Sequence, residues 1–457
     1  MKAFETVNPA NGETLERYPL ADESGIEATL GRAAAAQLDW AARPLEERLN
    51  GLSRLADLFE QKQDSLAELM TREMGKPIAQ ARSEAAKCAR AFRYYVAEAP
   101  RLLADEAIAT DAAHSAVLYQ PLGVIFAIMP WNFPFWQVAR FAAPSLAAGN
   151  AGLLKHAPNT TGCGLAFAEL VREAGMPEGV FQSIVIDTDQ AARVIADRRI
   201  AAVTLTGSER AGRAVAATAG EHLKKCVLEL GGSDPFVVLA DADLDKAVET
   251  GVTARFQNNG QSCIAAKRFI VEAPVYDDFC ARIRARTAAL KMGDPGDEAN
   301  DLGPMARDDL RDALERQVNA SLKEGAQRLD DAGRPQGPGF FYRPDVLTGV
   351  APGMPAAEEE LFGPVAAVMR AADEANALKL ANATPYGLGG SVWTLDPERG
   401  ERFARKLASG SAFVNGMVKS DPRLPFGGIK QSGYGRELSA AGLREFLNIK
   451  TLWIAAD

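Results

Sequence analysis

The sequence predicts an α/β protein whose core is an open, mostly parallel β-sheet, and three observations lead to this prediction. Apolar strand-like runs alternate with helical runs from Val124 to Leu230, the order expected of parallel strands with covering helices. The chain of 457 residues is long enough for two or three domains with well-buried cores. Its hydrophobic share of 47% and its many alanines and glycines are ordinary for an α/β enzyme.

The first hundred residues are predicted to be mainly helical. Residues 8–13 read as a turn between two short strands. From Ile26 to about Leu103 the chain is rich in Ala, Leu, Glu and Arg at helical spacing, with interruptions near Pro44 and at residues 75–77. We expect three or four amphipathic helices here, which cover a sheet and contribute little to the chemistry.

A buried-strand pattern at residues 201–205 runs into Gly207 and Ser208 and then into a helix that ends at about Ala219. A strand, a glycine-containing turn and a helix N-terminus can hold a pyrophosphate through free N–H groups and the helix dipole. The glycines do not form the G-x-G-x-x-G pattern, and many strand–turn–helix joints look similar. By itself this segment is therefore weak evidence for a nucleotide site.

The stretch from Glu229 to Cys263 places a carboxylate and a thiol at opposite ends of one strand–helix unit. It predicts a strand over 235–239 and a helix over 244–256, with Asp243 as the N-cap and a stop at Asn259-Gly260. Each functional group stands beside glycines, which allow a ligand to approach the backbone. A lone cysteine is usually a small buried hydrophobe, and a lone glutamate is usually a surface charge. Together they indicate covalent catalysis, with the thiol as nucleophile and the carboxylate handling protons or water.

Further elements are predicted outside these regions. Residues 115–125 read as a β-hairpin around a proline, and 266–271 as a strand. A helix is expected over 308–324, and a loop followed by a strand at 359–365. The tail from about 437 to 453 should include a strand, which needs a partner because an unpaired edge exposes backbone groups.

Charge and cysteine content exclude several classes of function. The chain has 51 basic and 60 acidic residues without a dense Lys/Arg block, which argues against nucleic acid or an anionic membrane as a partner. The five cysteines are scattered without a C-x-x-C pair, so neither a disulfide framework nor a zinc site is expected. No secretory signal is evident, and the most apolar region, 124–136, is broken by Pro130 and Pro134. We therefore expect a cytoplasmic protein.

Several short motifs together resemble the aldehyde dehydrogenase superfamily along essentially the whole chain. The two most specific are E-L-G-G, which begins at Glu229, and G-Q-S-C, which ends at Cys263. P-W-N-F-P around Asn132 and E-E-L-F-G-P around Glu360 also match. The resemblance implies an aldehyde dehydrogenase fold of two open α/β, Rossmann-like domains with a small β element for oligomerisation.

The resemblance also implies domain limits and an assembly. Residues 1–108 and 124–230 would form the dinucleotide-binding domain, and 231–434 the catalytic domain with the nucleophile. Residues 109–123 and 435–457 would form the oligomerisation hairpin and tail strand of a homodimer or homotetramer.

Catalytic roles follow from the same resemblance. Cys263 would attack the aldehyde, and the Asn132 amide with the Cys263 N–H would hold the oxyanion. Hydride would then pass to the cofactor, and Glu229 would activate the water that hydrolyses the thioester. Read alone, Asn132 would be a structural residue capping a turn. A free thiol near pKa 8.5 is mostly protonated at pH 7, and the sequence does not rank what activates it.

The implied cofactor is NAD or NADP. The residues that the resemblance assigns to it are Trp131, Lys155, Gly207, Ser208, Gly212, Leu230, Glu360 and Phe362. Many NAD-preferring members carry a glutamate at the position of Pro158 to hold the adenosine ribose. Without this glutamate, no carboxylate at position 158 repels a 2′-phosphate, so the sequence does not exclude NADP as the cofactor.

The substrate is expected to be succinate semialdehyde or a similar small aldehyde, because the chain resembles bacterial NAD(P)-dependent succinate-semialdehyde dehydrogenases. Arg140 would grip the distal carboxylate, although structural ion pairing is the default for such an arginine. Trp136, Gln257 and Ser420 complete the substrate set; Gln257 replaces a second arginine that some members have.

Three alternatives remain from the sequence. One is a broad aliphatic or aromatic aldehyde dehydrogenase with Phe135 and Trp136 lining an apolar funnel. The second is a cofactor-free thiol esterase, which would leave the nucleotide-loop residues unexplained. The third is a non-enzymatic binding or structural role.

Overall fold

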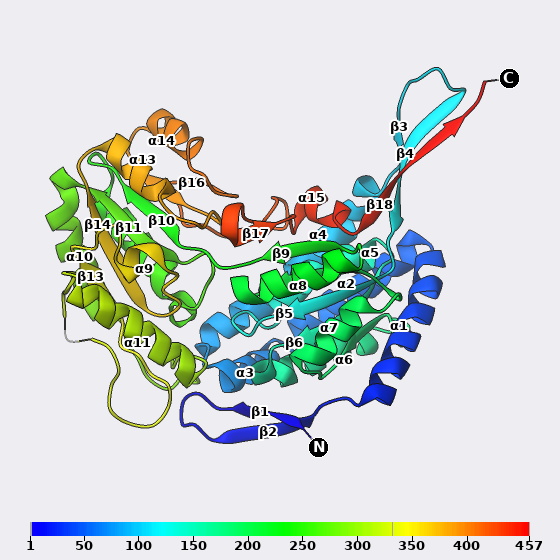
Figure 1. Ribbon diagram of the computed structural model, residues 1–457, viewed down its shortest axis with the longest axis horizontal. Coiled ribbons are helices and arrows are strands. Elements are labelled where there is room, and N and C mark those ends of the chain that lie inside the picture. The colour runs from blue at the N-terminus through cyan, green and yellow to red at the C-terminus, as the bar shows by residue number, and fades with distance from the viewer. Residues whose placement is uncertain (1, 331, 457) are drawn as a thin grey trace.

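The computed structural model describes residues 2–330 and 332–456. Two large sheets form two bodies side by side, and a narrow β arm projects from one of them (Figure 1). The C-terminus lies near the tip of this arm, whereas the N-terminus lies on the opposite side of the molecule (Figure 1). Among the described residues, no helix is both long and apolar enough to cross a membrane.

The N-terminal part is a small two-stranded sheet followed by helices. The elements are β1 (Ala3–Val7), β2 (Thr14–Pro19), α1 (Glu23–Ala42), α2 (Leu45–Gln61), α3 (Gln63–Met74) and α4 (Ile78–Leu102). The predicted turn at 8–13 and the expected helices are confirmed, and so are the breaks at Pro44 and at residues 75–77. Gly75 ends α3 in the left-handed conformation, with φ of 74°. The division between α2 and α3 at Lys62 was not predicted, because neither Gly nor Pro marks it.

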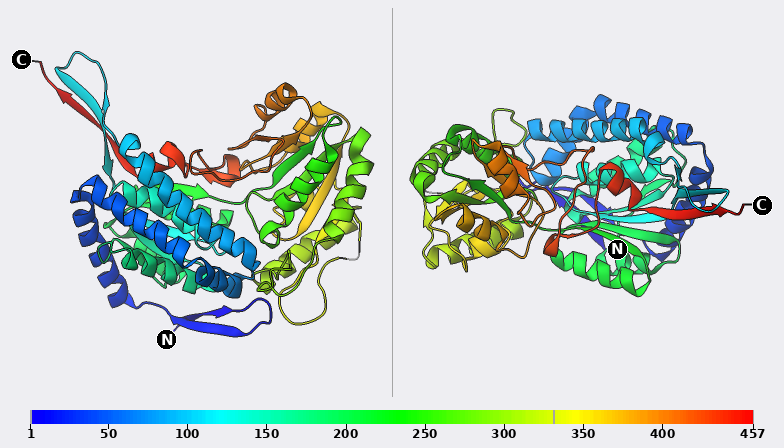
Figure 2. Two further views of the ribbon diagram at one scale, coloured as in Figure 1. Left: turned by 180° about the vertical axis from the view of Figure 1, so that it is seen from behind. Right: turned by 90° about the horizontal axis from the view of Figure 1, so that it is seen from above.

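The first large sheet has the order β17-β9-β8-β5-β6-β7. Its strands are β5 (Val124–Met129), β6 (Ala151–His156), β7 (Phe181–Ser183), β8 (Ile200–Thr206), β9 (Lys225–Glu229) and β17 (Gly433–Tyr434). Its helices are α5 (Trp136–Ala147), η1 (Pro158–Thr160), α6 (Thr161–Glu173), α7 (Thr188–Ala196) and α8 (Glu209–Glu221). All pairings except that of β17 are parallel, which confirms the predicted open parallel sheet. Seen from above, blue N-terminal helices lie on one side of it and green helices on the other (Figure 2).

The second large sheet has the order β12-β13-β14-β11-β10-β15-β16. Its strands are β10 (Asp234–Val238), β11 (Ala266–Glu272), β12 (Gln327–Arg328), β13 (Asp345–Thr348), β14 (Val365–Ala371), β15 (Ser391–Trp393) and β16 (Phe413–Val414). The helical elements along this part are α9 (Leu244–Phe256), η2 (Gln257–Gly260), η3 (Ala273–Val275), α10 (Tyr276–Ala288), α11 (Asp308–Lys323), α12 (Pro355–Glu358), α13 (Glu374–Asn382) and α14 (Pro397–Ala404), and η4 (Lys430–Ser432) leads back to the first sheet. The predicted strands at 235–239 and 266–271 and the helices at 244–256 and 308–324 are present.

The projecting arm is a three-stranded sheet in the order β18-β4-β3. It consists of β3 (Glu106–Ala107), β4 (His114–Pro121) and the tail strand β18 (Leu447–Ile454), which follows α15 (Ser439–Arg444). The predicted hairpin over 115–125 is therefore wrong, because β4 pairs with β3 and β18 while β5 belongs to the first large sheet. The burial explains the difference. β5 is almost wholly buried, as in a central parallel strand, whereas much of β4 is accessible.

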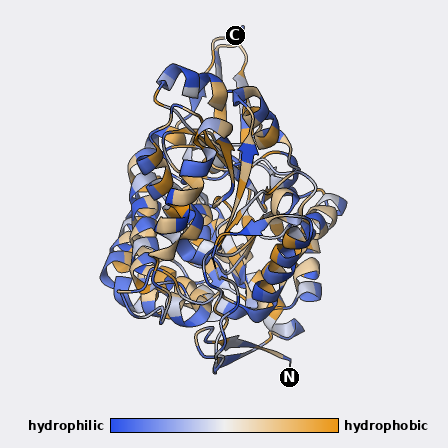
Figure 3. Ribbon diagram, turned by 90° about the vertical axis from the view of Figure 1, so that its left-hand side faces the viewer, coloured by the Kyte–Doolittle hydropathy of each residue, from blue (hydrophilic) through white to orange (hydrophobic). Residues whose placement is uncertain are grey.

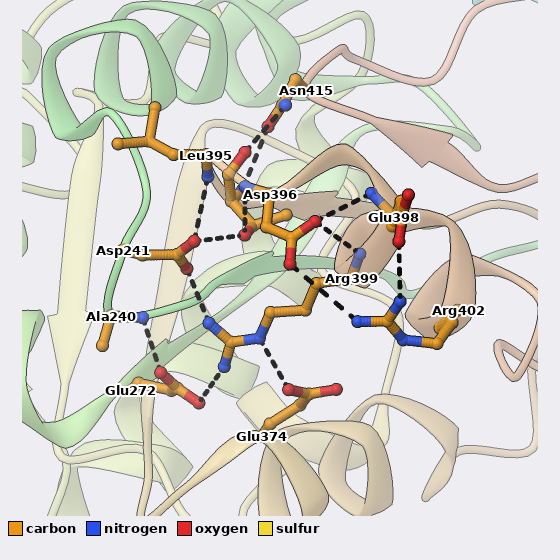
Figure 4. Close-up of polar contacts among 11 residues, drawn as sticks. Ala240, Asp241, Glu272, Glu374, Leu395, Asp396, Glu398, Arg399, Arg402 and Asn415 are labelled. Atoms are coloured by element: carbon orange, nitrogen blue, oxygen red, sulfur yellow. Dashed lines mark hydrogen bonds and ion pairs between the residues drawn. The ribbon is translucent and has the colours of Figure 1, made fainter.

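The apolar residues gather on the strands and on the inward faces of the helices. In Figure 3 orange segments concentrate in the interior and blue segments on the outer helices. Beside the second sheet, an ion-pair network joins several segments of the chain (Figure 4). The Arg399 guanidinium on α14 contacts three carboxylates, with 2.7 Å to Asp241, 2.7 Å to Glu374 and 3.5 Å to Glu272. This arginine joins the segment that follows β10, the last residue of β11 and the first residue of α13.

Candidate active site

The loop that carries Cys263 has an unusual backbone. After α9, Asn258, Asn259 and Gly260 have φ values of 54°, 56° and 71°, so three consecutive residues are left-handed. Asparagine tolerates this region better than other residues with a side chain, and glycine enters it freely. A Cβ on Gly260 would lie 2.4 Å from the Gly363 carbonyl oxygen, so no other residue fits there.

Side-chain amides hold this loop in place. The Asn259 Nδ2 donates to the carbonyls of Gly75 and Pro304, and its Oδ1 accepts from the Gly303 N–H. The Asn258 Nδ2 donates to the carbonyl of Asn132 at 2.7 Å. The loop is therefore fixed to segments from both large bodies before any ligand binds.

Cys263 opens onto a cavity of about 240 Å³ that contains most of the predicted site. The lining residues are Pro130, Trp131, Asn132, Gln137, Thr206, Gly207, Ser208, Leu230, Gly231, Cys263, Leu310, Glu360 and Phe362. The cavity thus brings together a thiol, an amide, a helix N-terminus and a carboxylate from separate parts of the chain.

Asn132 is oriented by a neighbour that the sequence did not single out. The Gln137 Nε2 donates to the Asn132 Oδ1 at 3.0 Å, and the Asn132 Nδ2 donates to the Gln261 carbonyl at 3.1 Å. The amide N–H group therefore faces the nucleophile loop, where an oxyanion donor is needed. Gln137 follows Asn132 by five residues, at the start of α5, but nothing in the sequence distinguishes it from other polar helix residues.

The thiol of Cys263 is protonated in this environment. Burial raises its pKa to about 11, opposed by the positive charges of Arg140 and Lys267. Nothing in the sequence distinguishes Lys267 either. Its Nζ donates to the carbonyls of Ser262 and Cys263, at 2.8 and 2.7 Å, and lies 3.1 Å from Glu360. Lys267 therefore connects the nucleophile loop to a carboxylate of the cavity.

Glu229 ends β9 directly before the cavity residues Leu230 and Gly231. It is buried, and neither carboxylate oxygen has a hydrogen-bond partner among the described residues. Burial raises its pKa well above 4.5, and the nearby negative charge of Glu437 raises it further. The charge of Glu229 also acts on the Cys263 thiol, which places the two groups close together although Glu229 does not line the cavity.

Arg140 is not a free cation in this structure. It is buried on α5, forms an ion pair with the equally buried Glu437 and donates to the Thr206 hydroxyl at 3.1 Å. Its guanidinium also lies over the Phe426 ring, 4.8 Å from the centroid. Arg140 therefore forms the structural ion pair expected by default for such an arginine. It lies directly behind Thr206, which is part of the cavity wall.

The cavity residues fit a dinucleotide. Gly207 and Ser208 stand where β8 turns into α8, and the Ser208 hydroxyl caps the helix by accepting from the Ala211 N–H. A Cβ on Gly207 would meet only one atom, at 3.7 Å, so the backbone there is open to a phosphate. At the other end Trp131 and Phe362 pack edge to face, with centroids 5.6 Å apart, beside Glu360. This arrangement offers an anion site, a carboxylate for hydroxyl groups and an apolar place for a ring.

Two predicted cofactor residues lie outside the cavity lining. Gly212 on α8 is buried against Leu230, and a Cβ there would meet Leu230 at 2.7 Å, so this glycine sets how closely the helix approaches the cavity wall. Lys155 is half-buried in β6, one residue before the strand ends, and its Nζ lies 3.4 Å from the His156 carbonyl.

Of the four predicted substrate residues, two line a second cavity of about 370 Å³, and Arg140 does not. Trp136 and Gln257 line it together with Lys87, and Ser420 accepts a hydrogen bond from the Lys87 Nζ at 2.7 Å. Within the described residues, no three His, Cys, Asp or Glu side chains come together as a metal site.

Comparison with known proteins identifies relatives over the whole chain. The sequence profile of the aldehyde dehydrogenase family matches residues 1–452. The succinate-semialdehyde dehydrogenase [NADP(+)] 1 of Mycobacterium tuberculosis is 50% identical over 453 residues, which cover 98% of this chain and 99% of that protein. The probable succinate-semialdehyde dehydrogenase [NADP(+)] of Synechocystis is also 50% identical, over 99% of this chain and 100% of its own.

Solved structures agree with these relatives. Gox0499, studied for its cofactor and substrate selection, has a TM-score of 0.98 at 42% identity and covers 100% of both chains. The succinic semialdehyde dehydrogenase of Streptococcus pyogenes, solved with NADP+, has a TM-score of 0.97 at 37% identity, covering 99% of this chain and 100% of its own.

Proposed function

The chain belongs to the aldehyde dehydrogenase family, and we propose that it oxidises succinate semialdehyde to succinate with NADP+. One observation carries the proposal. The cavity that begins at the N-terminus of α8 also contains the Cys263 thiol and the Asn132 amide. A nucleophile, an oxyanion donor and a dinucleotide site therefore share one space.

Cys263 attacks the aldehyde carbon in the first step. The oxyanion that forms is held by the Asn132 amide and the Cys263 N–H, and such a donor is worth roughly 3–4 kcal/mol. Gln137 keeps the Asn132 amide turned toward this point, so no reorientation is required. Since the thiol begins protonated, its proton must leave before or during attack, and Arg140 and Lys267 favour the thiolate.

NADP+ supplies a hydride acceptor for the bound aldehyde carbon. Gly207 and Ser208 would bind its pyrophosphate, Glu360 a ribose hydroxyl, and Trp131 with Phe362 would border the nicotinamide. Pro158, where NAD-preferring members carry a glutamate, leaves room for a 2′-phosphate. Lys155, which the family resemblance assigns to the cofactor, would supply a cation for that phosphate; its Nζ lies 3.4 Å from the His156 carbonyl.

Glu229 is proposed as the general base of the second step. Its raised pKa makes its carboxylate a stronger base than an ordinary glutamate once it is ionised. It removes a proton from water, which then attacks the Cys263 thioester and releases succinate.

Absorbance at 340 nm tests the proposal directly. The protein is mixed with succinate semialdehyde or pentanal and with NAD+ or NADP+ in all four combinations. We expect the highest kcat/KM with succinate semialdehyde and NADP+, and no reduction by a Cys263→Ser variant. Equal values for the two aldehydes would indicate a broad-specificity enzyme, and no reduction in any combination would refute dehydrogenase activity.

We also propose a cytoplasmic homo-oligomer. Three large apolar side chains on β18 of the projecting arm are about half exposed: Ile449 59%, Trp453 52% and Ile454 48%. A second copy that covers this arm would bury them and would explain why the arm leaves the body. Light scattering of the wild type and of a chain ending before β18 tests this. The cytoplasmic location rests on the scattered cysteines without a C-x-x-C pair, which favour a reducing compartment.

A further inference from the structure

Lys267 is a buried lysine that stands directly after the turn that carries the nucleophile. It is the second residue of β11, which lies between β10 and β14 in the second large sheet. The turn before it is closed by a hydrogen bond from the Ala265 N–H to the Ser262 carbonyl at 3.2 Å. The lysine side chain is only 1% exposed. Its ammonium group is therefore held from a strand in the interior of the sheet, where the backbone cannot shift easily.

All three donors of this ammonium group are engaged. The Nζ donates to the Ser262 carbonyl at 2.8 Å and to the Cys263 carbonyl at 2.7 Å, and it lies 3.1 Å from the Glu360 carboxylate. An ammonium group has three N–H donors and no acceptor. Glu360 is itself fixed, because its carboxylate also accepts from the Gly232 N–H at 3.1 Å. The lysine side chain thus cannot turn away without leaving buried polar groups unpaired, which is costly inside a protein.

The contact with Ser262 determines how the Cys263 N–H is directed. The Ser262 carbonyl and the Cys263 N–H belong to one trans peptide, so they lie in one plane and point in opposite directions. Fixing the carbonyl on the Lys267 ammonium group therefore fixes the N–H on the other side. In residues 2–330 and 332–456 no hydrogen-bond acceptor is found for the Cys263 N–H. This N–H remains available for an oxyanion.

The charge of Lys267 has two separate effects at the nucleophile. A cation at the Ser262 carbonyl oxygen polarises the peptide and makes the N–H at its other end a stronger donor. The same charge opposes the raised pKa of the Cys263 thiol. The effect on the thiol acts in every reaction of the thiolate, whereas the effect on the peptide acts only in a reaction that forms an oxyanion. The two effects can therefore be measured separately.

We propose that Lys267 is a positioning residue of the oxyanion site, which orients and polarises the Ser262–Cys263 peptide so that its N–H stabilises the oxyanion. The proposal rests on the proposed dehydrogenase function and assigns one further residue to that site. Lys267 acts on the backbone donor as Gln137 acts on the Asn132 amide. Each of the two oxyanion donors is then held by a buried side chain that does not itself bind the oxyanion.

Two reagents that need no cofactor separate the two effects. With p-nitrophenyl acetate the Cys263 sulfur attacks the carbonyl carbon, an oxyanion forms, p-nitrophenolate leaves, and an acetyl thioester remains. With iodoacetamide the sulfur displaces iodide from a saturated carbon and forms a thioether without an oxyanion. In both reactions the thiol proton passes to the solvent. The ratio of the acylation rate to the alkylation rate therefore reports on the oxyanion site, because the thiolate fraction cancels.

The test compares Lys267→Met, Lys267→Gln and Lys267→Arg with the control Lys246→Met. Methionine removes the charge and the donors, glutamine keeps an amide donor in case the apolar variant does not fold, and arginine keeps both charge and donors. Lys246 is an exposed lysine on α9, 3.1 Å from Asp243. Circular dichroism verifies the fold of each full-length variant. Stopped-flow absorbance measures the first release of p-nitrophenolate, and peptide masses confirm that both reagents modify Cys263.

We expect Lys267→Met and Lys267→Gln to lower the ratio of acylation to alkylation by about tenfold or more, less than the roughly 10²–10³ for removal of a whole oxyanion donor. Lys267→Arg should retain most of the ratio, and Lys246→Met all of it. An unchanged ratio in the folded methionine or glutamine variant would show that Lys267 acts only on the thiol, and would overturn this proposal alone. A wild type whose Cys263 is alkylated but not acylated would overturn the oxyanion site and the proposed function with it.

Discussion

Replacing Arg140 by methionine should destabilise the protein in a manner that depends on pH. The Arg140–Glu437 pair is buried, with side-chain exposures of 3% and 4%, and Glu229 lies beside it. Methionine fills much of the arginine volume but leaves two acidic groups without the cation. Breaking such a buried pair costs about 3–5 kcal/mol when the remaining charge stays ionised.

The sign of the pH effect follows from the two carboxyl groups. Burial already raises the pKa of Glu437, and Arg140 opposes this effect. Without Arg140 the folded-state pKa rises further above the unfolded value near 4.5, so the folded variant retains a proton that the unfolded chain releases. Stability then falls as pH rises from 4.5. The difference between variant and wild type should be small at pH 5 and reach about 3 kcal/mol near pH 8.

Urea unfolding followed by tryptophan fluorescence measures this difference at pH 5, 6, 7 and 8. The double variant Arg140→Met/Glu437→Met should recover much of the loss, because both charges are then replaced by apolar groups. Arg101→Met, which breaks an exposed pair, should change stability by less than about 1 kcal/mol at every pH. If Arg140→Met is as stable as the wild type at pH 8 and selectively raises the KM for succinate semialdehyde, Arg140 binds the substrate and the reasoning fails.

Three further predictions concern other parts of the structure. Asn132→Ala should lower kcat about a hundredfold or more, because it removes one oxyanion donor, and an unchanged kcat in steady-state assays would exclude that role. Burial raises the pKa of Glu73 to about 7, so the wild type should lose about 3 kcal/mol of stability as pH rises from 4.5 to 7. Glu73→Gln should remove this loss. Urea midpoints that change with pH in the same way in variant and wild type would contradict this prediction. Arg399→Met should lower the free energy of unfolding by about 2 kcal/mol, since it removes the cation that the surrounding carboxylates share at a partly exposed site. An unchanged urea midpoint would show that the network does not stabilise the fold.

Much of the fold follows from local patterns. The Asp243 cap and the positive-φ residues after Phe256 are visible in the sequence, and the structure has α9 with these limits. The parallel sheet from β5 to β9 likewise follows from buried-strand runs between helices. The hairpin over 115–125 failed because pairing was inferred from proximity alone. β5 is uniformly apolar and buried, whereas β4 mixes polar and apolar residues and is largely accessible, in keeping with two different sheets.

Site residues that belong to a short sequence motif could be predicted. Residues whose role depends on contacts with distant segments of the chain could not. The motifs bring Cys263 and Asn132 to one cavity as expected. The ion pair of Arg140 with Glu437 joins α5 to a segment near the C-terminus, and no local pattern relates the two. Lys87 and Lys267 have the same limitation, since their contacts with Ser420 and Glu360 exist only in the folded chain.

The central claim is that Cys263 forms a thioester that Glu229 then helps to hydrolyse. The most direct measurement mixes the Glu229→Gln variant with succinate semialdehyde and NADP+, records absorbance at 340 nm, and then determines the mass of the peptide that contains Cys263. We predict a burst close to one NADPH per active site, slow turnover afterwards, and a mass increase on that peptide equal to a succinyl group. Full turnover without an acylated Cys263 would contradict the account.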